Sequence, residues 1–259
     1  MNLKRGVLKI KSILVSQPEP ENPKSPYFEL ARKHGLKIDF RSFIEVVGVP
    51  AKEFRQQKIN ILDFTAVVFT SKTAIDHFFR IAEETRVNIP DTMKYFCISE
   101  ATAYYLQKYI VYRKRKIFYG NGLITDLLEV MHKHRDEKFL LPLSAAHKEE
   151  IPELLKTNSF IFSKAILYRT ECSDLSDLAD VNYDILVFYS PSGIKSLFQN
   201  FPDFKQNDTK IASFGTKTAK AAEDAGLRLD ITAPQPKAPS MTMAIENFIV
   251  DYNKNNGKP

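Results

Sequence analysis

The chain has 259 residues, of which 44% are hydrophobic and 26% are charged, a composition that suits one large globular domain or two smaller ones. Its net charge of +6 favours anionic partners. No apolar run approaches the length of a membrane span, no signal peptide is expected, and neither the two cysteines, Cys97 and Cys172, nor the scattered histidines have a metal-ligand spacing. We therefore expect a cytoplasmic protein with no metal site and no membrane partner.

Short apolar runs alternate with segments of helical periodicity along the whole chain. The first half is expected to contain strands at 9–15, 36–40, 66–69, 95–98, 117–119 and 139–143, helices at 27–34, 73–83, 101–109, 123–131 and 149–157, a Pro-rich loop at 16–26, and an extended segment at 43–49 before Pro50. The second half is expected to contain strands at 160–169, 185–188, 210–214 and 228–232 and helices at 192–199, 217–225 and 240–253. Alternating strands and helices predict parallel sheets built from βαβ units.

One sequence pattern occurs twice. Phe69–Phe79 and Phe188–Phe198 share the pattern Phe-x-Ser-x-x-small-Ile-x-x-x-Phe, and they lie 119 residues apart. A second echo, Ser99–Ala103 and Gly215–Ala219, is separated by 116 residues. A period this long that is seen only twice indicates two similar lobes rather than a solenoid.

The N-terminal βαβ piece has too few strands to stand alone, so we expect the C-terminal part of the chain to complete it. This predicts a discontinuous first lobe of residues 1–45 plus 172–259 and a second, inserted lobe of residues 52–166. Residues 46–51 and 167–171 would then link the lobes as a two-stranded extended ribbon. Each lobe is expected to present the Ser and Thr groups of its strand ends to a shared cleft.

Ser71 and Ser190 occupy the same place in the two copies, between the end of a strand and the start of a helix. The plain interpretation is an N-cap, which satisfies free backbone donors of the helix. The functional interpretation is that the same N–H groups and the helix dipole bind an anion. The matched positions strengthen the functional interpretation.

Several segments together resemble the uroporphyrinogen-III synthase family. They are Val67–Ser71, Ile166–Thr170, Asp184–Gly193 and Ile211–Ala219, and the resemblance covers about residues 10–250. It implies two doubly wound parallel-sheet lobes of flavodoxin-like βαβ units joined by a two-stranded extended linker. It also implies a lyase that cyclises linear hydroxymethylbilane to uroporphyrinogen III, with inversion of ring D and loss of water, and that needs no cofactor.

The resemblance implies a set of site residues. Tyr168 matches a family tyrosine linked to departure of the terminal hydroxyl; the alternative is a packed tyrosine whose hydroxyl bonds to the backbone. Thr218 matches a family threonine, with a purely capping role as its alternative. The residues expected to bind the polycarboxylate substrate are Ser71, Lys72, Ser99, Thr102, Ser190, Ser192, Gly193, Thr216, Lys217 and Thr218. Lys72 and Lys217 could also be simply solvated.

Two departures from the family pattern keep other functions open. Gln17 stands where family members often carry Arg, and Ser144-Ala-Ala-His147 replaces a second frequent Arg, which weakens carboxylate pairing. One alternative is therefore a catalytically weak or inactive two-lobe binding protein for an anionic small molecule. Another, nucleic-acid binding through Arg113–Lys116, rests on composition alone. We expect a monomer that binds a tetrapyrrole and no nucleic acid.

Overall fold

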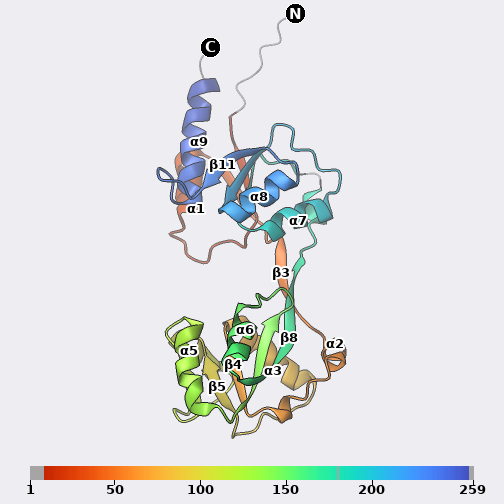
Figure 1. Ribbon diagram of the computed structural model, residues 1–259. Coiled ribbons are helices and arrows are strands. Elements are labelled where there is room, and N and C mark those ends of the chain that lie inside the picture. Colours follow the sequence, from red (N-terminus) through yellow and green to blue (C-terminus); the bar gives the residue numbers. More distant parts are fainter. Residues whose placement is uncertain (1–8, 180, 257–259) are drawn as a thin grey trace, which may run out of the picture. The chain divides into compact units, whose positions relative to one another are not determined.

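The computed structural model describes residues 9–179 and 181–256, so positions 1–8, 180 and 257–259 of the predicted first lobe lie outside the described residues (Figure 1). The chain divides into two compact units. Unit 1 consists of the described residues of Met1–Glu45 and Glu171–Pro259, and unit 2 is Val46–Thr170. Both units are doubly wound α/β structures with parallel sheets, which confirms the predicted fold class.

Unit 1 contains a five-stranded parallel sheet in the order β11-β10-β9-β1-β2. Its strands are β1 (Ser12–Val15), β2 (Lys37–Phe40), β9 (Ile185–Phe188), β10 (Lys210–Phe214) and β11 (Leu229–Ala233). Its helices are α1 (Pro26–His34), α7 (Pro191–Asn200), α8 (Thr216–Asp224) and α9 (Met241–Asn256), with a 3-10 turn at Ser176–Leu178.

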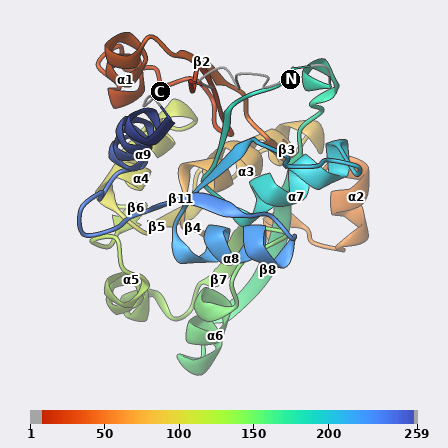
Figure 2. The same ribbon diagram turned by 90° about the horizontal axis from the view of Figure 1, so that it is seen from above.

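Helices cover both faces of the unit 1 sheet because its buried strands alternate their side chains between two cores. Ile13 and Val15 of β1 pack with residues of α1 and α9, whereas Leu14 packs with residues of α7 and α8. Helices α1 and α9 come from opposite ends of the chain and lie side by side (Figure 2). Gly35 ends α1 in the left-handed conformation at φ 64°, as its position in the sequence predicted.

Unit 2 contains a six-stranded sheet in the order β3-β8-β7-β4-β5-β6. Its strands are β3 (Ile44–Gly48), β4 (Ala66–Phe69), β5 (Lys94–Cys97), β6 (Ile117–Tyr119), β7 (Lys138–Ser144) and β8 (Ile161–Cys172); β3 and β8 each run a few residues past the unit boundary. Its helices are α2 (Ala51–Gln56), α3 (Lys72–Glu84), α4 (Glu100–Tyr105), α5 (Ile124–Met131) and α6 (Glu150–Thr157), with 3-10 turns at Ile61–Asp63, Leu106–Lys108 and His132–His134.

The core of unit 2 follows the same alternation. Val67 and Phe69 of β4 pack with residues of α3 and α4, whereas Ala66 and Val68 pack with residues of α5 and α6. Of the segments expected to form a linker ribbon, 46–51 overlaps the end of β3 and 167–171 lies in β8. These strands are neighbours in the sheet, and Val49 N–H donates to Leu167 O at 2.8 Å beside their pairing.

The two units have the same order of strands in space but start at different strands. In unit 2 the row β8-β7-β4-β5-β6 begins along the chain at β4, the first strand of the repeated pattern. In unit 1 the corresponding row is β2-β1-β9-β10-β11, where β9 begins the pattern and β1 and β2 come before it. The units are therefore circular permutants of each other, and the repeated pattern covers the part, β4–β5 and β9–β10, that follows the same chain order in both.

Candidate active site at the strand ends

The carboxyl edge of the unit 2 sheet gathers several of the predicted site residues. Ser71 and Ser99 follow the adjacent strands β4 and β5, and Ser144 ends β7 on the other side of β4. Tyr168 on β8 is the register partner of Ser144. The chain runs from β4 outward to β6 and then returns to β7, so β4 and β7 meet at a topological switch point, where open α/β sheets bind ligands.

Tyr168 contacts His77 of α3 and Ser71, the N-cap of that helix. Its hydroxyl lies 3.5 Å from the Ser71 Oγ, a long contact that leaves the phenol able to bind another oxygen. Its ring stacks on the ring of His77, with centroids 5.1 Å apart and planes 16° apart. The backbone-bonded alternative does not match this geometry, because the hydroxyl faces a side-chain hydroxyl at the end of β4.

The N-cap interpretation of the serines is confirmed. The Oγ atoms of Ser71, Ser99 and Ser190 accept the backbone N–H groups of the third residues of their helices, at 3.1, 3.3 and 3.2 Å. Each cap satisfies one of the helix's free amides. In α3 and α4 the amides of the first two helical positions stay without an intrahelical acceptor, whereas α7 begins at Pro191, which has no N–H, so only the Ser192 amide is left there. Capping and anion binding are therefore compatible at the same turn.

The remaining predicted residues of unit 1 differ in exposure. Ser192, Thr216 and Lys217 are exposed, whereas Thr218 is 2% exposed and lies at the third position of α8. The capping alternative for Thr218 is wrong, because Gly215, at φ 84°, is the N-cap of α8.

Gly193 is buried, and its N–H donates to the Ser190 Oγ. This amide is therefore committed to the helix cap.

Lys72 is exposed but has an aromatic neighbour. Its Nζ lies 5.3 Å from the centre of the Tyr105 ring, and the Tyr105 hydroxyl donates to Asp76 at 2.9 Å. Tyr109 and Lys108 donate to the same carboxylate. Burial acts to raise the pKa of Asp76, but the hydrogen bonds from Tyr109, Tyr105 and Lys108 outweigh it and lower that pKa. The cluster fixes α3 to α4 beside Lys72.

The two positions that depart from the family pattern carry no free cation. Gln17 is exposed. His147 is held by its neighbours: its Nδ1 lies 2.8 Å from the Ser144 carbonyl, and its Nε2 lies 3.0 Å from Glu149, which also binds Lys164.

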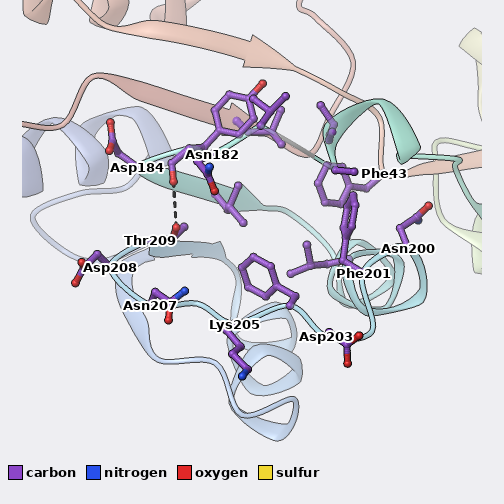
Figure 3. A pocket seen from close by; sticks show the side chains of 18 of the residues that line it. Phe43, Asn182, Asp184, Asn200, Phe201, Asp203, Lys205, Asn207, Asp208 and Thr209 are labelled. Atoms are coloured by element: carbon purple, nitrogen blue, oxygen red, sulfur yellow. Dashed lines mark hydrogen bonds between the residues drawn. The ribbon is translucent and has the colours of Figure 1, made fainter.

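In unit 1, a cavity of about 710 Å³ lies at the amino edge of the sheet, the edge opposite to the one where Ser190 follows β9 (Figure 3). Tyr183, Asp184 and Thr209 line it at the starts of β9 and β10, over an apolar floor that includes Phe43. None of the predicted site residues lines this cavity, and ligands of open α/β sheets bind at the carboxyl ends of the strands. We therefore place the candidate site at the strand ends and not in this cavity.

Residues 25–243 match the family model described as uroporphyrinogen-III synthase HemD. The chain belongs to the uroporphyrinogen-III synthase family. A curated relative from Chlorobaculum parvum (strain DSM 263 / NCIMB 8327), named uroporphyrinogen-III synthase, is 24% identical over 250 residues, which make up 91% of this chain and 98% of the relative.

A solved structure of a uroporphyrinogen-III synthetase shares the fold. The crystal structure of uroporphyrinogen-III synthetase from Helicobacter pylori 26695 matches with a TM-score of 0.56 at 18% identity, over 93% of this chain and 99% of that chain. Family model, relative and fold agree. The protein is a lyase of tetrapyrrole and heme biosynthesis, and the alternative of a binding protein without turnover is not favoured.

Two features are absent from the part of the chain that the structure describes. Across the described ranges, 9–179 and 181–256, His, Cys, Asp and Glu side chains form no group of three or more that could hold a metal ion. In the same part of the chain, no helix combines the length and the apolar character needed to cross a bilayer.

The sequence did not reveal the contacts of Tyr168. His77 was one of several scattered histidines, and Arg80 had no motif. One signal was present: the second copy of the repeated pattern has Ser196 and Gln199 where the first has His77 and Arg80. The two copies also differ at Lys72, Thr73, Asp76 and Phe78, so this difference alone does not single out His77 and Arg80.

Proposed function

We propose that this protein closes hydroxymethylbilane to uroporphyrinogen III with inversion of ring D, and that Tyr168 assists the departing hydroxyl. The observation that carries the assignment of this residue is the position of its phenol, at the carboxyl edge of the unit 2 sheet beside the Ser71 cap. The Tyr168 side chain is partly buried against the core of unit 2.

The reaction requires little chemical assistance from the protein, because the substrate's own pyrrole ring drives the bond breaking. A pyrrole nitrogen pushes electrons toward the terminal hydroxymethyl carbon, the C–O bond breaks, and the leaving oxygen takes a proton and departs as water. Attack by the substituted carbon of ring D, fragmentation and re-closure then give the inverted ring. Tyr168 contributes a hydrogen bond that becomes stronger as negative charge develops on the leaving oxygen.

Carboxylates of the substrate are bound at helix N-termini. In unit 2, Ser71 and Ser99 supply hydroxyls, and the first amides of α3 supply donors next to Lys72. Thr102 is buried, and its Oγ1 lies 3.1 Å from the Ser99 Oγ, so it supports that cap. In unit 1, Ser190, Ser192 and Thr216 supply the corresponding groups beside Lys217. Thr218 and Gly193 shape their turns instead, because Thr218 is almost fully buried and the Gly193 amide already donates to Ser190. That the two sets line a common cleft stays a prediction.

The decisive experiment is an isomer assay. Hydroxymethylbilane generated enzymatically is added to purified protein, and the product isomers are separated after oxidation. Uncatalysed closure gives the uninverted isomer, so we expect the inverted isomer to predominate only with native protein and not with heat-denatured protein. Equal isomer ratios in the two samples would disprove the proposed activity.

We further propose that the enzyme is a cytoplasmic monomer that does not bind nucleic acid and uses no cofactor. Cys97 and Cys172 are both free thiols, as is usual in reducing compartments, and Arg113 of the basic run lies 3.5 Å from Asp91. Light scattering on the eluted protein should give the mass of one chain, 29.7 kDa. Retention of nucleic acid at physiological salt, or a dimer mass, would contradict this part of the proposal.

A further inference from the structure

Helix α3 carries a chain of contacts that ends at the phenol of Tyr168. Arg80 Nε donates to His77 Nδ1 at 3.1 Å, one turn apart on the helix. The His77 ring then stacks on Tyr168, and the N-cap of the same helix, Ser71, faces the phenol hydroxyl. One helix and its N-cap thus supply both the ring that stacks on Tyr168 and the hydroxyl that faces its phenol.

The guanidinium of Arg80 is itself fixed by the backbone. Its Nη2 donates to the carbonyl of Val49 at 2.8 Å and to that of Leu167 at 3.2 Å. Leu167 directly precedes Tyr168, so Arg80 binds the strand that carries the phenol as well as the histidine that stacks on it.

Gly48 makes room for this arrangement. A Cβ atom built on Gly48 would lie 2.6 Å from the guanidinium carbon of Arg80, closer than real contacts allow. The requirement for glycine here is one of space, because Gly48 is not among the glycines with positive φ.

The hydrogen bond from Arg80 also fixes the form of His77. Because Nδ1 accepts the hydrogen bond from Arg80, the neutral ring carries its single N–H hydrogen on Nε2. Partial burial and the charge of Arg80 lower the pKa of His77, against the opposing carboxylates of Asp76 and Glu84 on the same helix. Tyr168 therefore stacks on a neutral imidazole at neutral pH.

We propose that Gly48, Arg80 and His77 are positioning residues that hold the phenol of Tyr168 in its orientation toward the leaving hydroxyl. This inference rests on the proposed role of Tyr168. Hydrogen-bond assistance depends steeply on the position of the donor, so loss of the stacking partner lowers turnover more than substrate binding.

Two substitutions of His77 separate the ring from the hydrogen bond. His77→Asn keeps an acceptor for Arg80 and deletes the ring, whereas His77→Phe keeps a stacking ring and deletes the acceptor. We expect His77→Asn to lower kcat about 5- to 20-fold, with KM within about twofold of wild type, and His77→Phe to lower kcat less.

The matched control is His132→Phe in the same unit. His132 Nδ1 lies 2.8 Å from Arg135 Nη2, three residues on, and its ring lies 5.2 Å from that of Phe160. This histidine has the same kinds of contacts but does not touch Tyr168, so the control should keep wild-type kcat. Wild-type kcat in folded His77→Asn would overturn the proposal.

Gly48→Ala tests the chain of contacts from its far end. The added methyl forces the Arg80 guanidinium out of its hydrogen bonds with Val49, Leu167 and His77, so the thermal midpoint should fall and kcat per folded molecule should fall about 3- to 10-fold. Arg80→Lys should have a similar effect, since lysine cannot donate to His77 and two carbonyls in the same plane. A Gly48→Ala protein with full kcat would exclude the role of the arginine.

Two further measurements decide whether these residues act through Tyr168. In a Tyr168→Phe background, His77→Asn should cause no further loss of kcat; a loss that persists there overturns the proposal. If Tyr168→Phe itself proves fully active, the proposed role of Tyr168 fails, and the positioning is tested by NMR. The Cζ resonance of Tyr168 in protein labelled at tyrosine, identified by its absence in Tyr168→Phe, should shift in His77→Asn and not in His132→Phe. An unmoved resonance rules out positioning by His77.

Discussion

Units 1 and 2 share a strand order in space and a capping serine at the start of the equivalent helices α7 and α3, yet their helix faces differ. In α3, His77 and Arg80 lie six and nine residues after the cap, whereas α7 has Ser196 and Gln199 at these places. Ser196 is fully buried, and Asn200 Nδ2 donates to its carbonyl at 2.9 Å. In α7 this face stabilises the fold, and in α3 it contacts a tyrosine.

The strands that correspond to each other also differ. Strand β8 presents Tyr168 at the carboxyl edge, whereas the equivalent strand of unit 1, β2, ends at Phe40. Both units therefore keep a serine cap at the start of the equivalent helix, but the phenol of Tyr168, stacked on His77, has no counterpart at the end of β2, where Phe40 stands. We infer that binding is shared by the two units and that assistance to the leaving group belongs to unit 2.

The largest effect is expected from Tyr168→Phe, which deletes one hydroxyl from unit 2. The rate of formation of the inverted isomer should fall about 10- to 1000-fold, equivalent to about 1.4–4 kcal/mol of barrier, because hydrogen-bond assistance is lost while conformational control remains. Initial rate and thermal midpoint are measured on the same preparation.

The matched control is Tyr189→Phe in unit 1. The Tyr189 hydroxyl lies 2.7 Å from that of the buried Tyr27, so its removal leaves a buried hydroxyl without its partner and costs about 1–3 kcal/mol of stability. The rate per folded molecule should stay at the wild-type value. If Tyr168→Phe lost stability and not rate, the functional difference between the two units would disappear.

Much of the fold could be predicted from the sequence because its signals are local. Gly35 and Gly226 mark helix ends, and both have the left-handed backbone that glycine allows. The strands of the repeated pattern are short and fully buried, so their apolar runs were unambiguous.

Other parts of the fold depend on contacts that local patterns do not contain. Helix α2 was missed because it has six residues, directly follows Pro50 and buries only Phe54. Helix α4 is shorter than expected: it ends at Tyr105, and the chain tightens into a 3-10 turn where a helix to 109 was predicted. The circular permutation depends on the pairing of β1 with β9, which are more than 150 residues apart.

The sequence predicted the serine caps of the site but not the side chains that contact Tyr168. The serine caps follow from strand-to-helix turns that the sequence shows directly. The stacking of His77 on Tyr168 joins residues 91 positions apart, and nothing in either segment specifies the other.

The next effect tests whether binding is shared by the units. Ser71→Asp and Ser190→Asp keep a strong N-cap but add a negative charge where a substrate carboxylate is expected. Each should raise KM about 5- to 10-fold, since two like charges about 4 Å apart repel by about 1 kcal/mol even in water. Stability should not fall, which separates this effect from loss of the cap.

Asn60→Asp is the control for that charge change. Asn60 caps the turn before β4, at the amino edge of the sheet, where its Oδ1 accepts the Leu62 N–H at 3.2 Å. The same added charge at this edge should leave KM unchanged. A rise in KM for Ser71→Asp alone would show that unit 1 does not take part in binding.

A smaller effect is expected where the two copies differ by one methyl group. Gly193 occupies the place in α7 that Ala74 occupies in α3, and a Cβ there would make only an ordinary contact, 3.4 Å from the Phe188 ring. Gly193→Ala should therefore stabilise unit 1 by about 0.5–1 kcal/mol through helix propensity, as measured by urea unfolding. KM should not change, because the Gly193 amide already donates to Ser190. Destabilisation would show that the two turns are not equivalent.

The smallest effect concerns pH and the histidine that only unit 2 carries. Unfolded His77 binds a proton with a pKa of about 6.5, whereas in the fold burial, and then the charge of Arg80, lower that pKa. Below about pH 6.5 the proton therefore binds the unfolded chain more tightly, so stability that is complete at neutral pH is lost as the pH falls toward the pKa of the folded state. Asp76 and Glu84 on α3 oppose this shift, and His77 is only partly buried, so the loss should be small.

The His77→Phe variant isolates this pH effect. Its thermal midpoint should fall less than that of wild type between pH 7 and pH 5, because every other titrating group, including His134, is common to the two proteins. Protonation at His77 also ends its role as acceptor for Arg80, so kcat of the wild type should fall over the same range while that of His77→Phe changes less. If the curves of thermal midpoint against pH are parallel for wild type and His77→Phe, His77 has the same pKa in the folded and the unfolded chain.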